Sequence, residues 1–144
     1  MFGSEMVAQY VNGVLAGLAP VTAAVGGSIA NLMVVPEGMA LPAAIHYAET
    51  GDYTGPVHGD IDAERIRYLV RFICQGQSSD PIRAAALAMV RALNDTQASG
   101  SVTDTDGRSW FVSLTAVGEW PITTSVEGGV FYRQLGCYFQ VDVT

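Results

Sequence analysis

The sequence predicts an α+β domain in which two helices pack on one face of a mostly antiparallel β-sheet. Three observations carry this prediction. Residues 64–75 alternate between two sets of side chains with the period of two that is typical of a β-strand. Residues 80–93 place apolar side chains at the spacing of one helix face. Several other strand-like segments are joined by short loops, which favour antiparallel pairing.

The composition is that of one globular domain spanning residues 1–144. Hydrophobic residues make up 49% of the chain and charged residues 15%, which excludes a disordered chain. The 14 acidic residues outnumber the 7 basic ones, which are all arginine, and the formal net charge is −7. Proteins that track nucleic-acid phosphates need clustered positive charge, so this composition argues against tight binding to DNA or RNA.

We expect neither a membrane span nor a signal peptide. Gly, Pro, Ser, Thr and Asn interrupt every apolar stretch before it reaches about 18 residues, the length that a membrane-spanning helix needs. The N-terminus lacks a positively charged region followed by a continuous apolar core.

The first predicted element is an amphipathic helix near the N-terminus. Ser4 is a suitable N-cap, Glu5 lies in the first turn, and Pro20 is a natural stop. The apolar stripe of this helix consists of Val7, Val11, Val14, Leu15 and Leu18.

The segment that follows is harder to assign. Residues 21–33 are apolar with a Gly-Gly pair in the middle, which fits either a short helix or a loop leading into a strand. Residues 34–42 contain two prolines and are therefore expected to be extended or turning. Residues 43–48 alternate as a strand in which His46 faces opposite to its two neighbours, and residues 50–60 form a loop rich in Gly, Pro and Asp.

The centre of the predicted fold is the strand at residues 64–75 and the helix that follows it. The apolar face of the strand consists of Ile66, Tyr68, Val70, Phe72 and Cys74, and the other face of Arg65, Arg67, Leu69, Arg71 and Ile73. Asp80 is a fitting N-cap and Pro81 fits the first helical position. The helix stripe is Ile82, Ala86, Met89, Val90 and Leu93. Because each element has one apolar face, the helix is expected to pack onto the strand.

The C-terminal third predicts two or three strands. Residues 104–107 can form a hairpin turn between residues 101–103 and 110–115. Residues 118–129 are expected to be a second long loop, and residues 130–143 a long strand. One face of that strand carries Phe131, Leu135, Cys137, Phe139, Val141 and Val143; the other carries Tyr132, Gln134, Tyr138, Gln140 and Asp142.

No cluster of side chains predicts a metal or cofactor site. His46 and His58 are the only histidines, and neither has a ligand at helical or C-x-x-C spacing. Asp60, Asp62 and Glu64 would share one side of an extended chain and could bind a hard cation. A solvated strand entrance, or pairing with arginines of another strand or subunit, is the better interpretation of these carboxylates. We therefore expect no metal and no cofactor.

The sequence also lacks the features of a catalytic centre. Cys74 and Cys137 lie on apolar strand faces, which is typical of buried free thiols, whereas a nucleophilic cysteine needs an exposed, activated thiolate. A disulfide between the two is possible but not implied. No G-x-S-x-G, Walker A or G-x-G-x-x-G motif is present. We therefore assign no catalytic residues and do not expect an enzyme.

The three arginines on one strand face are the main anomaly of the sequence. One interpretation is an outer sheet face with surface salt bridges. The alternative is a subunit interface, because the planar guanidinium pairs with carboxylates while its stem packs on apolar surface. The last strand carries tyrosines on a similarly mixed face. We predict that the interface consists of Arg65, Arg67, Arg71, Tyr132 and Tyr138.

The order of elements provides a further clue. An amphipathic N-terminal helix precedes a Pro-containing segment at residues 36–47, an Arg-bearing strand at 65–74, a helix that opens on Ser-Asp-Pro at 79–81, and an alternating strand that closes at 139–143. This layout resembles that of the small tail terminator proteins of long-tailed bacteriophages, also called tail completion or neck proteins. The resemblance extends over residues 4–143 and rests on the pattern rather than on an invariant motif.

The resemblance implies a ring, usually a hexamer, that caps the head-proximal end of the tail tube. Such a ring stops tube polymerisation and offers a surface to the head connector. The implied partners are other copies of the chain, the tail tube protein and the head-closure or connector protein, while DNA only passes through the lumen. The implied location is the tail or neck region of a virion that is assembled in the host cytoplasm. An acidic chain suits such a conduit, since DNA must pass without sticking.

Two other interpretations stay open. One is another neck or tail component, such as a head-closure or adaptor ring or a tail tube protein; a tube protein forms long polymers, whereas a terminator stops at a ring. The other is a small enzyme or ligand-binding α+β domain, which would need a deep pocket with converging polar groups.

Overall fold

The structure is a computed structural model that describes residues 3–48, 64–76, 78–93, 99–127 and 130–144, with backbone alone for residues 3–4, 64, 115–127 and 130–131. The described helices are α1 (Gly3–Gly17), α2 (Ala19–Val25) and α3 (Asp80–Leu93). The described strands are β1 (Ile29–Ala30), β2 (Ala43–Ala48), β3 (Glu64–Gln75), β4 (Ser99–Thr103), β5 (Ser109–Glu127) and β6 (Val130–Val143).

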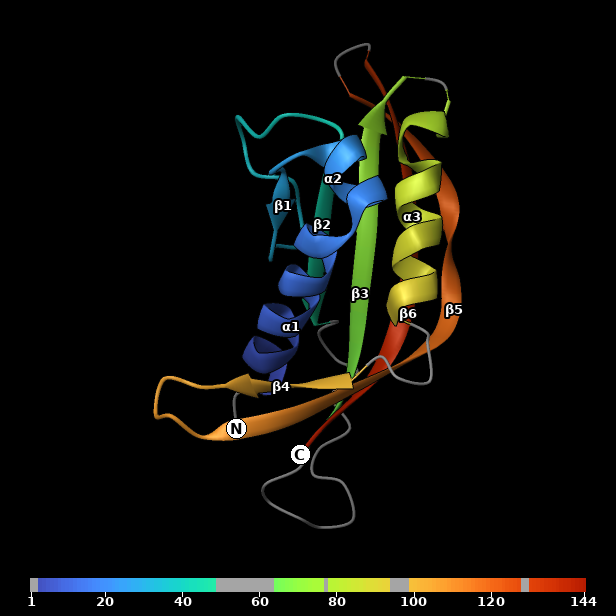
Figure 1. Cartoon of the computed structure of the whole chain (residues 1–144). Coiled ribbons are helices and arrows are strands. Elements are labelled where there is room, and N and C mark those ends of the chain that lie inside the picture. The colour runs from blue at the N-terminus through green and yellow to red at the C-terminus, as the bar shows by residue number, and fades with distance from the viewer. Residues whose placement is uncertain (1–2, 49–63, 77, 94–98, 128–129) are drawn as a thin grey trace.

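The strands form a six-stranded sheet in the order β1-β2-β3-β6-β5-β4. Every neighbouring pair is antiparallel except β1 and β2, so the predicted α+β class with a mostly antiparallel sheet is confirmed. The helices lie on one side of β3, and the sheet curls so that the β4–β5 hairpin extends sideways below α1 (Figure 1).

The core lies between the helices and the near face of the sheet. All five side chains of the predicted apolar face of β3 are buried, as expected from their alternation. They pack in one cluster with residues of α3 and α1, namely Ile82, Ala85, Met89, Leu93, Val7, Val11 and Leu15. Ala86 and Val90, which were expected in the stripe of α3, are only partly buried at its margin. The predicted packing of this helix on the strand is therefore confirmed.

The described part of the chain contains three helices, where two were expected. The ambiguous segment after residue 20 includes a short helix, α2, whose Val21 and Val25 are buried and which packs beside α3. Pro20 therefore does not end the helical region. It lies in the first turn of α2, where the N–H that proline lacks would have no helical acceptor. Gly26, with φ of 58°, then ends α2 in a conformation that suits glycine.

The prediction of a loop at residues 118–129 is wrong for residues 118–127, which belong to β5. β5 continues to Glu127 and stays paired with β6 as far as Val130. The register shifts between Ala116 and Gly118 and between Trp120 and Thr123 show that the Gly and Pro residues mark irregularities in a strand instead of its end. The predicted hairpin around residues 104–107 is confirmed, whereas residues 50–60 lie outside the described part of the chain.

The described helices are α1, α2 and α3. None of them is by itself long and apolar enough to span a bilayer, and α1 and α2 meet the length and composition criteria only as a pair, with a bend of 87° between them.

Replacement of Met89 by aspartate should unfold the domain. Met89 is fully buried, so Met89→Asp would place a carboxylate without a partner in the core. The cost of several kcal/mol is a large part of the roughly 5–15 kcal/mol by which domains are usually stable. We expect loss of the cooperative thermal transition in circular dichroism. The matched control is Leu87→Asp on the same helix, where the side chain is 49% exposed and the fold should survive. A cooperatively folded Met89→Asp protein would contradict the core assignment.

Candidate functional site

The face of the sheet opposite the helices gathers the predicted arginines. In the ladder between β3 and β6, Arg65 lies opposite Asp142 and Arg67 opposite Gln140. The alternation that buries Tyr68 and Val70 under the helices turns the side chains of Arg65, Arg67 and Arg71 to this other face. We call the set Arg65, Arg67, Arg71, Tyr138 and Asp142 the arginine face.

Contacts within the chain hold the arginine face in place. Arg65 Nε donates a hydrogen bond of 2.9 Å to Asp142 Oδ1, and the two side chains are 42% and 41% exposed. This hydrogen bond and the charge of Asp142 raise the pKa of the Arg65 guanidinium. The guanidinium of Arg67 lies 4.4 Å from the centroid of the Tyr138 ring, in a cation–π contact. The structure thus contains a surface salt bridge of the kind that one interpretation of these arginines expected.

Gly136 of β6 allows the Arg71 side chain to cross the ladder. A Cβ atom on Gly136 would lie 2.5 Å from the Val70 carbonyl oxygen and 2.8 Å from Arg71 Cγ. Both distances are shorter than a non-bonded contact of these atoms allows, so no larger residue fits at this position without movement of the strands.

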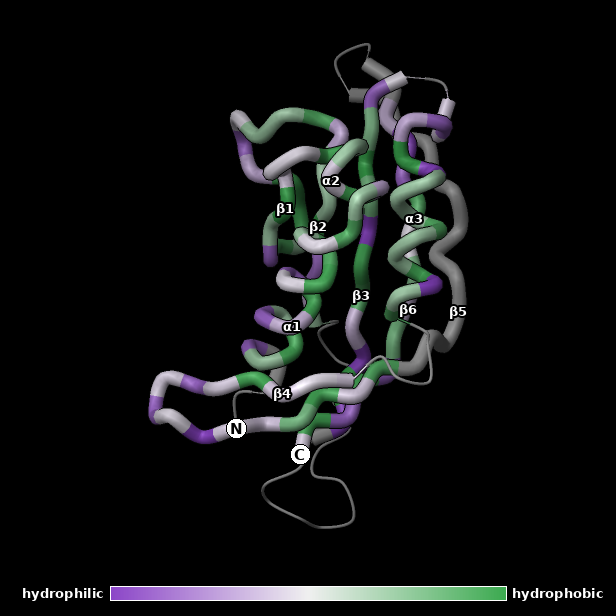
Figure 2. The backbone as a smooth tube through the Cα atoms, in the orientation of Figure 1, coloured by the Kyte–Doolittle hydropathy of each residue, from purple (hydrophilic) through white to green (hydrophobic). Residues whose placement is uncertain are grey.

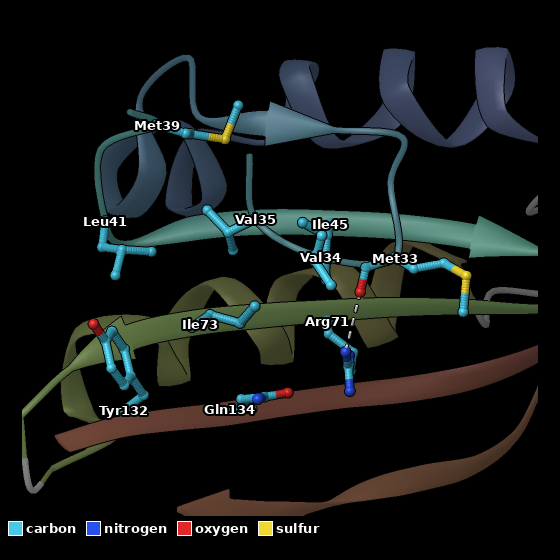
Figure 3. A pocket seen from close by; sticks show the side chains of 10 residues that line it. All are labelled: Met33, Val34, Val35, Met39, Leu41, Ile45, Arg71, Ile73, Tyr132 and Gln134. Atoms are coloured by element: carbon cyan, nitrogen blue, oxygen red, sulfur yellow. Dashed lines mark hydrogen bonds between the residues drawn. The ribbon is translucent and has the colours of Figure 1, made fainter. Parts of the chain in front are cut away.

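A groove whose lining side chains are mostly apolar lies at one end of this face. It has a volume of about 340 Å³ and lies between the strands and the segment at residues 31–42. Figure 3 shows the sheet residues on one side and the segment on the other, with Arg71 Nη2 donating a long hydrogen bond of 3.5 Å to the Met33 carbonyl. The lining consists of Met33, Val34, Val35, Met39, Leu41, Ile45, Arg71, Ile73, Tyr132 and Gln134.

The five predicted interface residues do not all lie together. Tyr132 lies in the groove, near the end of the β3–β6 ladder, whereas Tyr138 lies among the arginines. Arg71 belongs to both places. The groove also contains an acceptor that sequence reasoning missed: Gln134 Oε1 is buried and has no hydrogen-bond partner among the described residues. The rim is apolar and open, since Val34 is 70% exposed.

The β4–β5 hairpin, which extends sideways below α1, is a second feature of the described chain (Figure 1). Asp104 Oδ1 accepts hydrogen bonds of 2.9 Å from the backbone N–H groups of Asp106 and Arg108, and Oδ2 accepts one of 2.8 Å from Trp110 Nε1. The indole donor, followed by the backbone donors, lowers the pKa of Asp104. The turn is therefore rigid and hydrophilic at its tip (Figure 2). Just after it, Phe111 is 47% exposed.

His46 belongs to a buried polar network rather than to a metal site. Its Nδ1 lies 2.6 Å from the Tyr68 hydroxyl and its Nε2 lies 3.4 Å from Asn12 Oδ1. With Nε2 protonated, the ring donates to Asn12 and accepts from Tyr68, which links α1 to the sheet. Asn31 Oδ1 lies 3.5 Å from the same hydroxyl. Within the described residues no three His, Cys, Asp or Glu side chains gather as a metal site would require; His58, Asp60 and Asp62 lie outside them.

The two cysteines are free and buried, so the structure contains no disulfide between Cys74 and Cys137. Burial raises the pKa of the Cys74 thiol, although the charge of Arg133 partly opposes this. A buried thiol with a raised pKa is a poor nucleophile, in keeping with the structural role expected of these residues.

The comparisons with known proteins bear on the fold. The chain matches no protein-family model and no curated protein. Its structure is similar to a chain in the virion of a native gene transfer agent (GTA) particle, with a TM-score of 0.62 over 98% of this chain and 95% of that chain. The sequence identity is 17%, so the likeness establishes a common fold over nearly the whole length of both chains.

Substitution of Gly136 should destabilise the sheet. Gly136→Ala would force Arg71 and the β3 backbone away from β6, at a cost of about 1–3 kcal/mol in the free energy of unfolding. The control is Gly13→Ala in α1, where a Cβ atom would meet nothing within 4 Å and helix propensity should make alanine neutral or stabilising. Urea unfolding of both variants gives the comparison. Equal stability of the Gly136→Ala protein and the wild type would contradict the close approach.

His46 should make the stability depend on pH. Burial lowers the pKa of His46 from 6.5 to about 4. Between these values the unfolded chain binds a proton that the folded protein does not, so stability falls as the pH decreases through this window. The loss is nil above pH about 6.5 and reaches on the order of 3 kcal/mol near pH 4. Urea unfolding from pH 7 to 4 should show a weaker pH dependence for His46→Gln than for wild type. His58→Gln, which alters the other histidine, should keep the wild-type dependence.

Proposed function

We propose that this protein is a structural component of a phage-like particle and that it forms the tail terminator ring. The observation that carries this proposal is the near full-length fold likeness to a chain of the GTA virion. The order of elements, which resembles that of phage tail terminators, supports the more specific role. In this role the ring caps the head-proximal end of the tail tube and joins it to the head connector, with DNA passing through the lumen.

The arginine face is the proposed contact between neighbouring subunits. Arg65 and Arg67 are partly exposed and already oriented by Asp142 and Tyr138, so little side-chain freedom remains to be lost on binding. The chain carries a net charge of −7, which supplies carboxylates for these arginines on another copy. Tyr132 joins the contact from the groove, because it lies on the same face at the end of the strands.

The same fold likeness is compatible with a head-closure ring, an adaptor ring or a tail tube protein, since the likeness alone does not specify the component. The state of assembly separates these roles: a terminator stops at a closed ring, whereas a tube protein forms filaments. A small ligand-binding domain is less well supported, because the groove is open and its rim exposes apolar side chains such as Val34, which suits protein contacts.

Charge reversal on the arginine face tests the proposed interface. Arg67→Glu with Arg71→Glu should give a folded protein that no longer forms rings, because lost ion pairs across an interface cost on the order of 2–5 kcal/mol each. Sedimentation velocity and negative-stain microscopy measure the assembly, and circular dichroism confirms folding.

The matched control is Arg83→Glu with Arg91→Glu, which makes the same change of charge on the exposed side of α3. This control should assemble normally, since exposed ion pairs contribute less than about 1 kcal/mol. Normal rings from the Arg67 and Arg71 variant would place the contact elsewhere. Filaments of the wild-type protein would identify a tube protein, and monomers at every concentration would overturn the ring.

A further inference from the structure

We propose that the Phe111 side chain of one copy docks into the groove of a second copy of this chain. This inference rests on the proposed self-assembly and names the residues that make the contact.

The described part of this face has two features that could fit together, the exposed side chain of Phe111 and the groove. The large exposed apolar residues of the described chain are Leu32, Met33, Val34, Leu87 and Phe111. Met33 and Val34 line the groove, Leu32 precedes them in the chain, and Leu87 lies on α3. Phe111 alternates with the buried Val112, so its side chain lies on the face opposite the helices. Phe111 and the groove thus lie on the same face of the sheet.

Phe111 cannot reach the groove of its own chain. Its backbone pairs with Thr144, one residue beyond the end of the ladder at which Val143 meets Glu64. The groove lies beside Arg71 and Ile73, much further along β3. At about 3.3 Å per residue, this places the two features roughly 25 Å apart. A contact between them must therefore join two molecules.

The groove has the chemistry that an aromatic side chain requires. Val34, Leu41 and Ile73 provide apolar walls, and the methionines in the lining adapt their shape to an inserted ring. The guanidinium of Arg71 already lies 5.8 Å from the Tyr47 ring centroid, a geometry in which arginine attracts aromatic faces.

Charge also favours this pairing. The hairpin turn carries Asp104 and Asp106 with one cation, Arg108, whereas the arginine face combines three arginines with Asp142. Opposite local charges orient two copies that repel each other overall. Because Asp104 fixes the turn through three hydrogen bonds, the hairpin is ordered before it binds and loses little entropy on docking.

Cysteine cross-linking tests the contact while leaving Phe111 in place. Ser109→Cys combined with Val34→Cys should give covalent oligomers on mild oxidation, and a reductant should reverse them. The native Cys74 and Cys137 are buried and should not interfere. Leu87→Cys with Val34→Cys is the control, since Leu87 is as exposed as Phe111 but lies on α3. Adding Phe111→Ala to the first pair should abolish the cross-link.

Sedimentation of Phe111→Ala alone gives the second measurement. Loss of a buried aromatic anchor should weaken self-association at least tenfold, while Leu87→Ala should leave it unchanged. Normal rings from Phe111→Ala, without a cross-link between positions 109 and 34, would overturn the docking and leave the ring intact. Cross-linked two-fold dimers in place of rings would support the docking and overturn the terminator role. A wild-type protein that stays monomeric and gives no cross-link would overturn both.

Discussion

The structure depends on the antiparallel ladder between β3 and β6. All 12 residues of β3 are paired with β6, and β2 and β5 attach on either side of this pair. The period of two lets one ladder perform two tasks, because consecutive residues face opposite sides. Tyr68 and Val70 complete the core under the helices, while Arg67 and Arg71 are carried to the other face. A change in the register of β6 would alter both surfaces at once.

The segment at residues 31–42 connects these two surfaces. Asn31 lies beside the hydroxyl of Tyr68, which belongs to the core, whereas the carbonyl of Met33 accepts from Arg71 on the opposite face. The chain therefore passes around the edge of the sheet formed by the two-residue strand β1. In doing so it covers Ile45 and Ile73, which are buried although they face away from the helices, and it forms one wall of the groove. The buried histidine network and the candidate interface thus share a single connecting segment.

Much of this arrangement could be predicted from the sequence, where short-range periodicity decides the structure. The bounds of β2 and β6, the two faces of β3 and the turn at Asp104 follow from alternation and turn chemistry. The extent of β5 could not be predicted, because Gly118 and Pro121 signal a loop locally and only pairing with β6 overrides that signal. The arginines were found because their placement on one strand face is visible in the sequence. The groove was missed because its walls come from four segments, namely residues 31–42, β2, β3 and β6, whose proximity only the tertiary fold determines.

The irregularities of β5 have a consequence for how copies of this chain can meet. β4 pairs with β5 only from Ser109 to Ser113, so the described strands leave the outer edge of β5 uncovered from Leu114 to Glu127. A long open edge of this kind is a template for indefinite sheet growth between molecules. Pro121 lacks a backbone N–H, and the two register shifts bend the strand, so a straight incoming strand cannot form a continuous set of hydrogen bonds there. These irregularities hinder two molecules from joining their sheets edge to edge. They therefore favour association through side chains on the sheet face, where the number of contacts is finite and their geometry is fixed.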